Sequence, residues 1–518
     1  MHHDRSDMTR QNVLLITTDQ QHYNTLGVTD PLLRTPALDR LAAEGARFVR
    51  AYCVNPTCSP SRSTLITGLY PAWHGCWAIG VKLPEDIPTV GHIFQRNGYE
   101  SILIGKAHFQ PLRSSPGSES IECEPTLHDL DFWRGFHGPW YGFNHVETGR
   151  MHAHESHAGQ HYALWMQEKG LKNWRDYFQQ WPPNPTDKYR GPQYTRDAMV
   201  WDLPEELHHS HWVGERTVAH IERCAEVGRP FFLWSSFFDP HPPYAVPEPW
   251  ASMYDPAQMH PGSYVEGEFD NMPPQFAKTR EASPDYSMYH EPGGQALHGF
   301  HSHLHTDEEM RRSLACYYGM ISLIDLEVGR ILDALDRLGI AKDTLVLFSS
   351  DHGHFLGQHG LIAKGAFHYE DLLRIPMLVR WPGHVPAGAV STALQSQIDW
   401  PQTLLSACGI DAPGYMQGVD QLGVWCGQAG QARRWALVEN RHNPTTVHLR
   451  TLITDRFKIT VYRQAEYGEL FDLQADPEER RNCWSDPAYR EIKADLLLHF
   501  IQAEIQREPT RMPRIAEA

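Results

Sequence analysis

The chain has 518 residues, of which 41% are hydrophobic and 21% charged, a composition that excludes a disordered or fibrous protein. Its 63 acidic and 46 basic residues give a formal net charge of -17, which argues against non-specific binding to nucleic acid or to an anionic membrane. If the substrate is an anion, a local cluster of cations must attract it.

The polar start of the chain and its cysteines bear on location. The first eleven residues have no secretory-signal pattern, and no apolar run approaches the roughly 20 residues that a membrane span needs. The nine cysteines are odd in number and include no CxxC pair, which is typical of a reduced protein rather than of a disulfide framework. The sequence therefore predicts a cytoplasmic protein with no nucleic-acid partner and no membrane partner.

Short apolar runs alternate with helical patterns along most of the chain. The runs predict buried parallel strands at 13–16, 101–104, 231–234 and 344–348. Helices are predicted from Thr35-Pro36 to Leu41, from Thr89 to about Gly98, over 211–227, and from a capping box of Thr306 and Glu309 to Gly339. This alternation predicts a parallel sheet covered by helices on both faces.

Two long segments, 113–205 and 253–305, interrupt the alternation. They are rich in Trp, Tyr, His, Pro and Gly and show little periodicity, which is typical of lids, binding loops or subunit contacts. The aromatic residues of the first segment either line a substrate pocket or belong to the core or to a subunit contact. Together with a terminal helix over 486–506, these segments predict a homo-oligomer.

The character of the sequence changes near residue 418. Runs at 435–439, 447–454 and 457–462 predict antiparallel strands. We therefore divide the chain into a polar tail (1–11), a main domain that carries the two inserts (12–417) and a C-terminal subdomain (418–518).

Chemically active side chains follow each of the four predicted parallel strands. In chain order the strands run into Asp19 and Gln20, Lys106 and His108, Asp239 and His241, and Asp351 and His352. Because ligands of open α/β sheets bind outside the carboxyl ends of the strands, these side chains are expected to converge at one edge. For a single strand, a polar residue that merely meets water is the simpler explanation, but four such strands favour a site.

The carboxylates among these residues predict a metal site. Asp19, Gln20, Asp351 and His352 would supply two negative and two neutral ligands. Oxygen ligands suit calcium or magnesium, whereas an imidazole moves the preference toward manganese, iron or zinc.

The sharpest local feature is the run from Cys58 to Gly68, Cys-Ser-Pro-Ser-Arg-Ser-Thr-Leu-Ile-Thr-Gly. Ser59-Pro60 is typical of a helix start, so Cys58 is expected just before a helix N-terminus, where free backbone N–H groups favour an anion and lower a thiol pKa. Arg62 would lie about one turn along and could fork onto the same anion. A buried structural thiol is the alternative interpretation.

These motifs resemble those of a known family. Cys58-x-Pro60-Ser61-Arg62 followed by Thr67-Gly68 resembles the sulfatase signature, in which the cysteine is oxidised to formylglycine. Gly98-Tyr99 with Gly105-Lys106-Ala107-His108 resembles the second signature of the sulfatases. The resemblance continues in the expected order through Pro240–Tyr244, Ser350–Gly353, Gly360-Leu361 with Lys364, Glu469–Leu473 and Asp476–Glu478, and so covers nearly the whole chain.

The resemblance implies a fold and a cofactor. The fold is the alkaline-phosphatase-like α/β sandwich, with a central, mostly parallel sheet and a smaller C-terminal subdomain that holds an antiparallel sheet. One divalent metal ion, Ca2+ or Mn2+, would be held by Asp19, Gln20, Asp351 and His352 together with the modified residue 58. A separate formylglycine-installing enzyme would convert Cys58 to the aldehyde, whose hydrate attacks the ester.

The resemblance also implies a role for each remaining candidate. Arg62 would position the nucleophile and the metal site, and Lys106 and Lys364 would bind the charged oxygens of the reacting group. His241 corresponds to the general acid at the leaving oxygen, and His108 to the base that helps the hydrate collapse. Taken alone, either lysine would be a solvated surface charge.

Two positions depart from the common sulfatase pattern. Many sulfatases carry two consecutive aspartates where this chain has Asp19-Gln20, and often Asp-Asn where it has Asp351-His352. The variants in this chain resemble those of bacterial phosphonate monoester hydrolases and phosphodiesterases and of some bacterial sulfatases. We predict hydrolysis of a small anionic sulfate ester to sulfate and an alcohol. The alternative is a phosphonate monoester hydrolase or phosphodiesterase with the same site, and a remote third is a non-catalytic metal-binding scaffold with unmodified Cys58.

Overall fold

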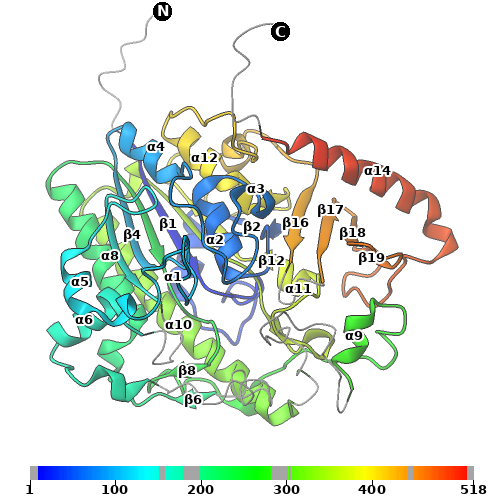
Figure 1. Ribbon diagram of the computed structural model, residues 1–518, viewed down its shortest axis with the longest axis horizontal. Coiled ribbons are helices and arrows are strands. Elements are labelled where there is room, and N and C mark those ends of the chain that lie inside the picture. The colour runs from blue at the N-terminus through cyan, green and yellow to red at the C-terminus, as the bar shows by residue number, and fades with distance from the viewer. Residues whose placement is uncertain are drawn as a thin grey trace, which may run out of the picture.

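The central sheet contains the four predicted strands as neighbours. The computed structural model describes residues 10–150, 158–178, 198–281, 302, 305–441 and 447–509. The sheet has eight strands in the order β14-β2-β13-β9-β1-β7-β4-β5. Its central members are β9 (Thr344–Ser350), β1 (Asn12–Thr18), β7 (Phe231–Ser236) and β4 (Glu100–Lys106), which pair in parallel. The predicted parallel core of the sheet is therefore confirmed (Figure 1).

Shorter strands extend the sheet at both edges. On one side β5 (His145–Gly149) pairs in parallel with β4. On the other side β13 (Met377–Arg380) runs antiparallel to β9 and is followed by β2 (Ala46–Phe48) and β14 (Ala389–Ser391). The sheet is thus mixed but mostly parallel, as the family resemblance implied.

Alternate residues of β1 point into two apolar cores, one on each face of the sheet. Val13 and Leu15 belong to one core, and Leu14 and Ile16 belong to the other. The first core is covered by α2 (Cys58–Thr67), α4 (Val90–Arg96) and α12 (Trp400–Ala407), and the second by α1 (Pro36–Glu44), α8 (His209–Glu226) and α10 (Asp307–Arg337). A strand that is buried on both faces carries a continuous apolar run, which is why its sequence is easily recognised.

The predicted helices are present, with shifted ends. α10 begins with the predicted capping box: the Thr306 hydroxyl accepts the Glu309 backbone N–H, and the Glu309 carboxylate accepts the Thr306 backbone N–H. α8 begins at His209, two residues earlier than predicted, because the side chain of His208 caps it by accepting the Ser210 backbone N–H.

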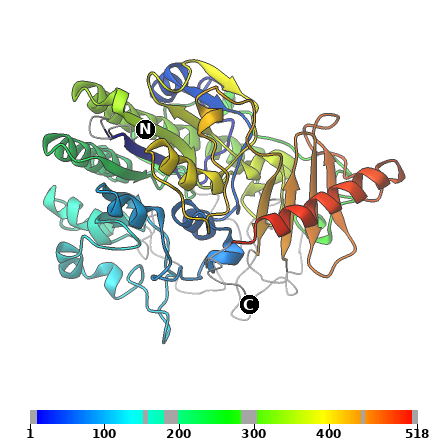
Figure 2. The same cartoon turned by 90° about the horizontal axis from the view of Figure 1, so that it is seen from above.

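The C-terminal part forms a second, antiparallel sheet. Its strands follow chain order: β16 (Ala436–Asn440), β17 (Leu449–Ile453), β18 (Phe457–Tyr462) and β19 (Gly468–Asp472). The first three strands were predicted, whereas the residues of β19 stood out only as a family motif. The terminal helix α14 (Arg490–Gln506) crosses this sheet (Figure 1 and Figure 2), with Leu496 and Phe500 in one apolar cluster with Leu437 and Leu452.

The long inserts hold regular structure that their sequences did not indicate. The first contains α5 (Leu130–Gly135), β5 and α6 (Gln160–Glu168), and the second contains α9 (Pro274–Lys278). Trp133, Trp140, Trp165 and Trp174 are all buried. These aromatic side chains therefore belong to the core, which was one of the two interpretations. The stretches 151–157, 179–197, 282–301 and 303–304 lie outside the described residues.

Two features relate to the predicted location. All nine cysteines are free thiols, as expected. Within the described ranges, no helix combines the length and the apolar character that crossing a membrane requires.

Candidate active site

Two carboxylates meet where β1 and β9 end. These strands pair in register up to Thr18 and Ser350, so the residues that follow, Asp19 and Asp351, emerge side by side. Both are 0% exposed. The Asp19 backbone N–H donates to the carbonyl of Asp239 at 3.0 Å, which ties the end of β7 to the same place. The strand ends thus converge as their topology requires.

Cys58 is the first residue of α2, so the helix begins one position earlier than expected. Its Sγ lies 3.4 Å from Asp19 Oδ1, 3.3 Å from His352 Nε2 and 3.2 Å from Lys364 Nζ. Burial raises the pKa of the Cys58 thiol, and the charge of Asp19 adds to the effect, which outweighs the lowering by Lys106 and Lys364. The expected low thiol pKa is therefore wrong, because full burial penalises the thiolate more than the nearby cations favour it.

Two buried cations contact the two carboxylates, and a third, Lys364, lies beside Cys58. Arg62 Nε donates to Asp351 Oδ2 at 2.8 Å, and Lys106 Nζ contacts the Asp19 carboxylate. Lys364 follows β11 (Ile362–Ala363) and is 4% exposed. Burial alone would raise the pKa of Asp19, but the three cations hold it below its usual value. Both carboxylates therefore have the partners that buried charges need.

The donor set fits a divalent metal ion. Four of the predicted ligands each offer one atom within 4.8 Å of the others: Asp19, Cys58, Asp351 and His352. The fifth, Gln20, has a buried side-chain oxygen, Oε1, with no hydrogen-bond partner among the described residues. A buried oxygen of this kind is rarely left unsatisfied, and a cation would satisfy it.

The imidazole of His352 is prepared to bind a metal through one nitrogen. Its Nδ1 donates to the carbonyl of Gly353 at 2.9 Å, which leaves Nε2 without a proton. Burial lowers the pKa of His352 to about 4, so the ring is neutral at pH 7. The metal ligands would be two carboxylates, an amide oxygen and one neutral nitrogen. The oxygen ligands suit Ca2+, whereas the imidazole nitrogen favours Mn2+.

The two predicted acid–base histidines are also neutral. His241 Nδ1 donates to the carbonyl of Pro242 at 2.5 Å, and its Nε2 accepts from Lys364 Nζ at 3.3 Å. The His108 backbone N–H donates to Glu122 Oε1 at 3.0 Å, and His108 Nδ1 is buried with no hydrogen-bond partner in the described part of the chain. Burial first, and nearby cations next, hold the pKa of both imidazoles well below the usual value.

The sequence analysis missed residues that support this cluster. Gln397 Nε2 and the Ser61 hydroxyl both donate to the backbone carbonyl of Asp351, at 2.6 and 2.5 Å. Arg150, which follows β5, is buried, and its charge contributes to the low pKa of His108. The signal for Arg150 was its place after a strand, but β5 lies in an insert for which no strand was predicted.

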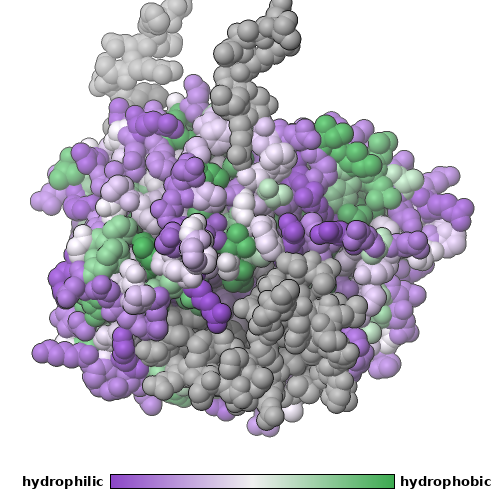
Figure 3. All heavy atoms as spheres, in the orientation of Figure 1, coloured by the Kyte–Doolittle hydropathy of each residue, from purple (hydrophilic) through white to green (hydrophobic). Residues whose placement is uncertain are grey.

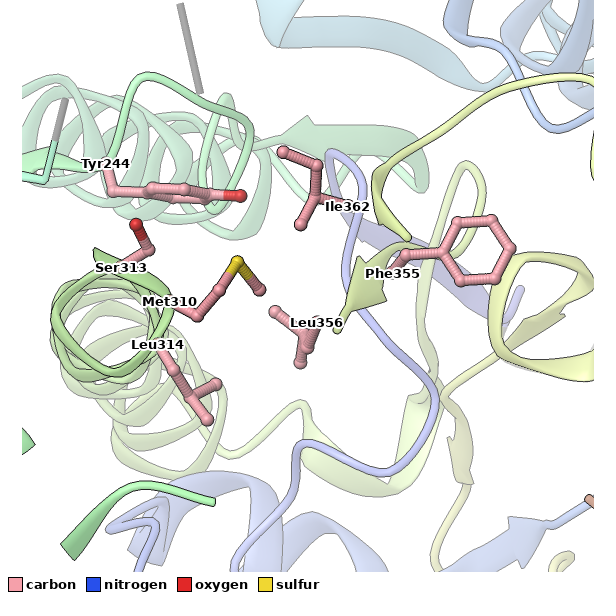
Figure 4. A pocket seen from close by; sticks show the side chains of 7 residues that line it. All are labelled: Tyr244, Met310, Ser313, Leu314, Phe355, Leu356 and Ile362. Atoms are coloured by element: carbon pink, nitrogen blue, oxygen red, sulfur yellow. The ribbon is translucent and has the colours of Figure 1, made fainter. Parts of the chain in front are cut away.

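A small cavity lies beside Tyr244. Its other walls are Met310, Ser313, Leu314, Phe355, Leu356 and Ile362 (Figure 4). Its volume is about 10 Å³, which is enough for at most about one water molecule. This cavity is therefore too small to bind an ester substrate.

Comparison with known families assigns the chain to one of them. The family model of the sulfatases matches residues 11–410, and a model described as N-sulphoglucosamine sulphohydrolase, C-terminal, matches residues 357–506. The chain therefore belongs to the sulfatase family, a family of enzymes that hydrolyse sulfuric esters.

Individual relatives support this assignment. The chain is 27% identical to an uncharacterized sulfatase, YidJ, of Escherichia coli (strain K12), over 95% of this chain and 88% of that protein. It is 26% identical to an arylsulfatase of Clostridium perfringens, over 96% of this chain and 95% of that protein. The crystal structure of a phosphonate monoester hydrolase of Agrobacterium radiobacter matches with a TM-score of 0.77 and 24% identity over 98% of both chains, which shows a shared alkaline-phosphatase-like fold.

Replacing Asp351 with asparagine is expected to abolish tight binding of a divalent ion, because one of only two ligand charges is lost. The measurement is the metal content of the dialysed protein, with calorimetric titration of Mn2+ and Ca2+. Because His352 supplies a nitrogen, Mn2+ is expected to bind the parent protein more tightly than Ca2+.

Asp325→Asn is the matched control for this variant. Asp325 is 2% exposed but accepts the backbone N–H groups of Ala37 and Leu38, at the start of α1. Its variant should keep the metal content of the parent protein. A normal metal content in Asp351→Asn would show that the ligand assignment is wrong.

Proposed function

We propose that the protein hydrolyses sulfate esters, with a formylglycine derived from Cys58 as its nucleophile. The observation that carries this proposal is the position of Cys58, whose Sγ lies within 3.4 Å of Asp19, His352 and Lys364 at the start of a fully buried helix. A nucleophile placed there meets both the cations that an anionic ester requires and the candidate metal ligands. Membership of the sulfatase family supports the same chemistry.

The unmodified thiol is poorly suited to this task. In the metal-free site its raised pKa keeps it protonated at pH 7, and the thiolate is the nucleophilic form. An aldehyde at the same position adds water and so offers two hydroxyl groups on one carbon. Because Cys58 is 1% exposed, the formylglycine-installing enzyme would have to act before the chain folds around this residue.

In the proposed reaction, one hydroxyl of the hydrated aldehyde gives up its proton to solvent and attacks sulfur in line with the leaving oxygen. A bond from sulfur to the oxygen of residue 58 forms, the bond from sulfur to the alcohol oxygen breaks, and that oxygen takes a proton from His241. The second hydroxyl then gives its proton to His108. The carbonyl re-forms as the bond from carbon to the sulfated oxygen breaks, sulfate leaves, and water restores the hydrate.

The cations hold the charged group during these steps. Lys106 and Lys364 would bind its non-bridging oxygens, and Arg62 keeps Asp351 in place. A bound divalent ion would supply Lewis-acid polarisation and lower the pKa of a coordinated hydroxyl.

His241 needs a proton on Nε2 to act as an acid. In the free site its Nδ1–H is held by the Pro242 carbonyl, and Nε2 accepts from Lys364. An anionic ester that enters beside these groups favours the imidazolium form, because a neighbouring negative charge raises the pKa of an imidazole. Substrate binding would thus prepare the acid.

A phosphonate monoester or phosphodiester is the alternative substrate for the same site. Because Gln20 and His352 are neutral ligands, the site is less negative than a site with additional carboxylates. This lower negative charge would let it accept a phosphorus ester in addition to a sulfate ester. Steady-state kcat/KM for a matched aryl sulfate, phosphonate monoester and phosphodiester tests the choice, and we expect the sulfate to be preferred.

The mass of the peptide that contains residue 58 tests the modification, and an unmodified, inactive protein would indicate a scaffold.

The two lysines are expected to differ when each is replaced with alanine. Lys364→Ala and Lys106→Ala should each lower kcat/KM by roughly 10²–10³, because each loses an electrostatic donor to the reacting group. Only Lys106→Ala should also lower the melting temperature of the metal-free protein, because it leaves the buried Asp19 carboxylate without its contact. Lys169→Ala, which removes an exposed ion pair with Glu215, is the control for both measurements. Near-parent kcat/KM in Lys364→Ala would remove that residue from the proposed site.

Cys58→Ser separates the aldehyde mechanism from an ordinary nucleophile. A serine hydroxyl at this place can attack, but the ester that results has no second hydroxyl on the same carbon and cannot expel sulfate. The variant should release about one equivalent of alcohol per active site and then stop, and mass spectrometry should find the sulfo group on residue 58. Sustained turnover at the parent rate would contradict the proposed mechanism.

We also propose that the protein is a homo-oligomer. The outer face of α14 exposes Leu498, Ile501 and Ile505, at 54%, 59% and 62%, and an apolar patch lies over part of this helix (Figure 3). Their spacing puts them on one helical face. Ile501→Glu with Ile505→Glu should convert the oligomer to a monomer of 59.3 kDa by light scattering. A parent protein that is already monomeric at micromolar concentration would refute the proposal.

The cytoplasm is the proposed location. All nine cysteines are free thiols, and seven of them are buried. Free thiols are typical of proteins in a reducing compartment.

A further inference from the structure

Gln20 differs from the other candidate ligands because its side chain ends in an amide, whose oxygen and NH2 group have nearly the same shape. Its amide oxygen attracts a cation, whereas its amide NH2 group repels one, so the orientation of this side chain decides whether it is a ligand. We infer that His354 and Tyr244 form a hydrogen-bonded pair that orients the Gln20 amide, with its oxygen facing the metal site. The inference rests on the proposed metal site and adds two positioning residues to it.

The contacts of Gln20 leave one atom available. Its Nε2 lies 2.7 Å from His354 Nδ1, whereas Oε1 is buried with no hydrogen-bond partner in the described residues. The backbone N–H of Gln20 donates to Asp351 Oδ1 at 2.9 Å, and its carbonyl accepts from the Tyr317 hydroxyl at 2.9 Å. Every polar group of Gln20 except Oε1 is therefore occupied, and Oε1 is the atom that a cation needs.

The orientation of the amide depends on the tautomer of His354. This ring is 0% exposed, and its Nδ1 faces the Gln20 amide nitrogen, which can only donate a hydrogen bond. His354 Nε2 lies 2.8 Å from the Tyr244 hydroxyl. When Nε2 carries the proton and donates to Tyr244, Nδ1 is bare and accepts from the Gln20 NH2 group. The opposite tautomer would bind the Gln20 oxygen and turn the NH2 group toward the ion.

A third side chain, Tyr317, holds the backbone of Gln20. Gln20 has a φ of 66°, in the left-handed region that residues other than glycine seldom adopt. Its carbonyl is held by Tyr317, and the ring of Tyr317 stacks on His354 with centroids 5.1 Å apart and planes 10° apart. The residue is thus fixed by its backbone and its side chain, which is what a ligand with a preset orientation requires.

The test measures metal affinity, not turnover. His354→Phe keeps an aromatic ring against Tyr317 but removes both hydrogen bonds, so Mn2+ should bind the full-length protein more than tenfold more weakly, a loss typical of removing a ligand's supporting partner. Tyr244→Phe removes only the outer hydrogen bond and should cause a smaller loss. His368→Phe is the matched control: His368 is also 0% exposed and hydrogen-bonded, to Thr451. It should bind Mn2+ as the parent does.

A double-mutant cycle separates positioning from packing. If His354 acts through Gln20, then His354→Phe should cause no further loss of Mn2+ affinity in a Gln20→Ala background. Additive losses of Mn2+ affinity in the double variant would overturn the inference. Parent affinity in both His354→Phe and Tyr244→Phe would also overturn it. If His354→Phe does not fold, Tyr244→Phe provides the test. Parent affinity in Gln20→Ala, with loss in Asp351→Asn, would overturn the inference and leave the proposed metal site intact. No Mn2+ or Ca2+ binding by the parent protein would reject both.

Discussion

The site depends on the burial of two carboxylates side by side. The parallel register of β1 and β9 brings Asp19 and Asp351 together with no exposure to water. Removing such charges from water costs on the order of several kcal/mol for each ion unless partners compensate. Arg62 from α2 and Lys106 from β4 supply part of that compensation. In the proposed holoenzyme, the divalent ion supplies the rest, so metal binding and folding stability are linked at this point of the sheet.

Close packing of two strand ends fixes the direction of Arg62. Gly105 has a φ of 99°, and a side-chain carbon there would lie 2.0 Å from the carbonyl oxygen of Ser236. Because glycine lets β4 and β7 approach this closely, Arg62 Nη1 can donate both to the Lys106 carbonyl at 2.9 Å and to the Ser236 hydroxyl at 2.7 Å. The guanidinium is therefore oriented by two strands as well as by Asp351. Lysine, which has no planar fork, could not make this set of contacts.

The sequence predicts the central strands and the candidate site better than the inserts. Strands such as β1 are buried on both faces and carry unbroken apolar runs, and the chemistry at their ends follows from the topology of parallel sheets. β5 lacks such a run, so Arg150 at its end was not found. The sequence analysis also missed the raised pKa of the Cys58 thiol, which follows from full burial beside Asp19. The sequence indicates where the helix starts, but it does not indicate that this start is buried. Ser61 and Gln397 support Asp351 through contacts between distant segments that no local pattern reveals.

The charge of the whole chain and the charge of the site have opposite signs. The protein has a formal net charge of -17, yet three cations, Arg62, Lys106 and Lys364, lie beside two carboxylates in the buried cluster. In bulk water with physiological salt, charges more than about 8 Å apart are largely screened, so the distant acidic surface has little effect on an anion that has entered the site. The local excess of positive charge acts at short range and with little water, where it is stronger. An anionic ester is thus attracted by the cluster itself, whereas the net negative charge of the whole chain disfavours non-specific binding of polyanions.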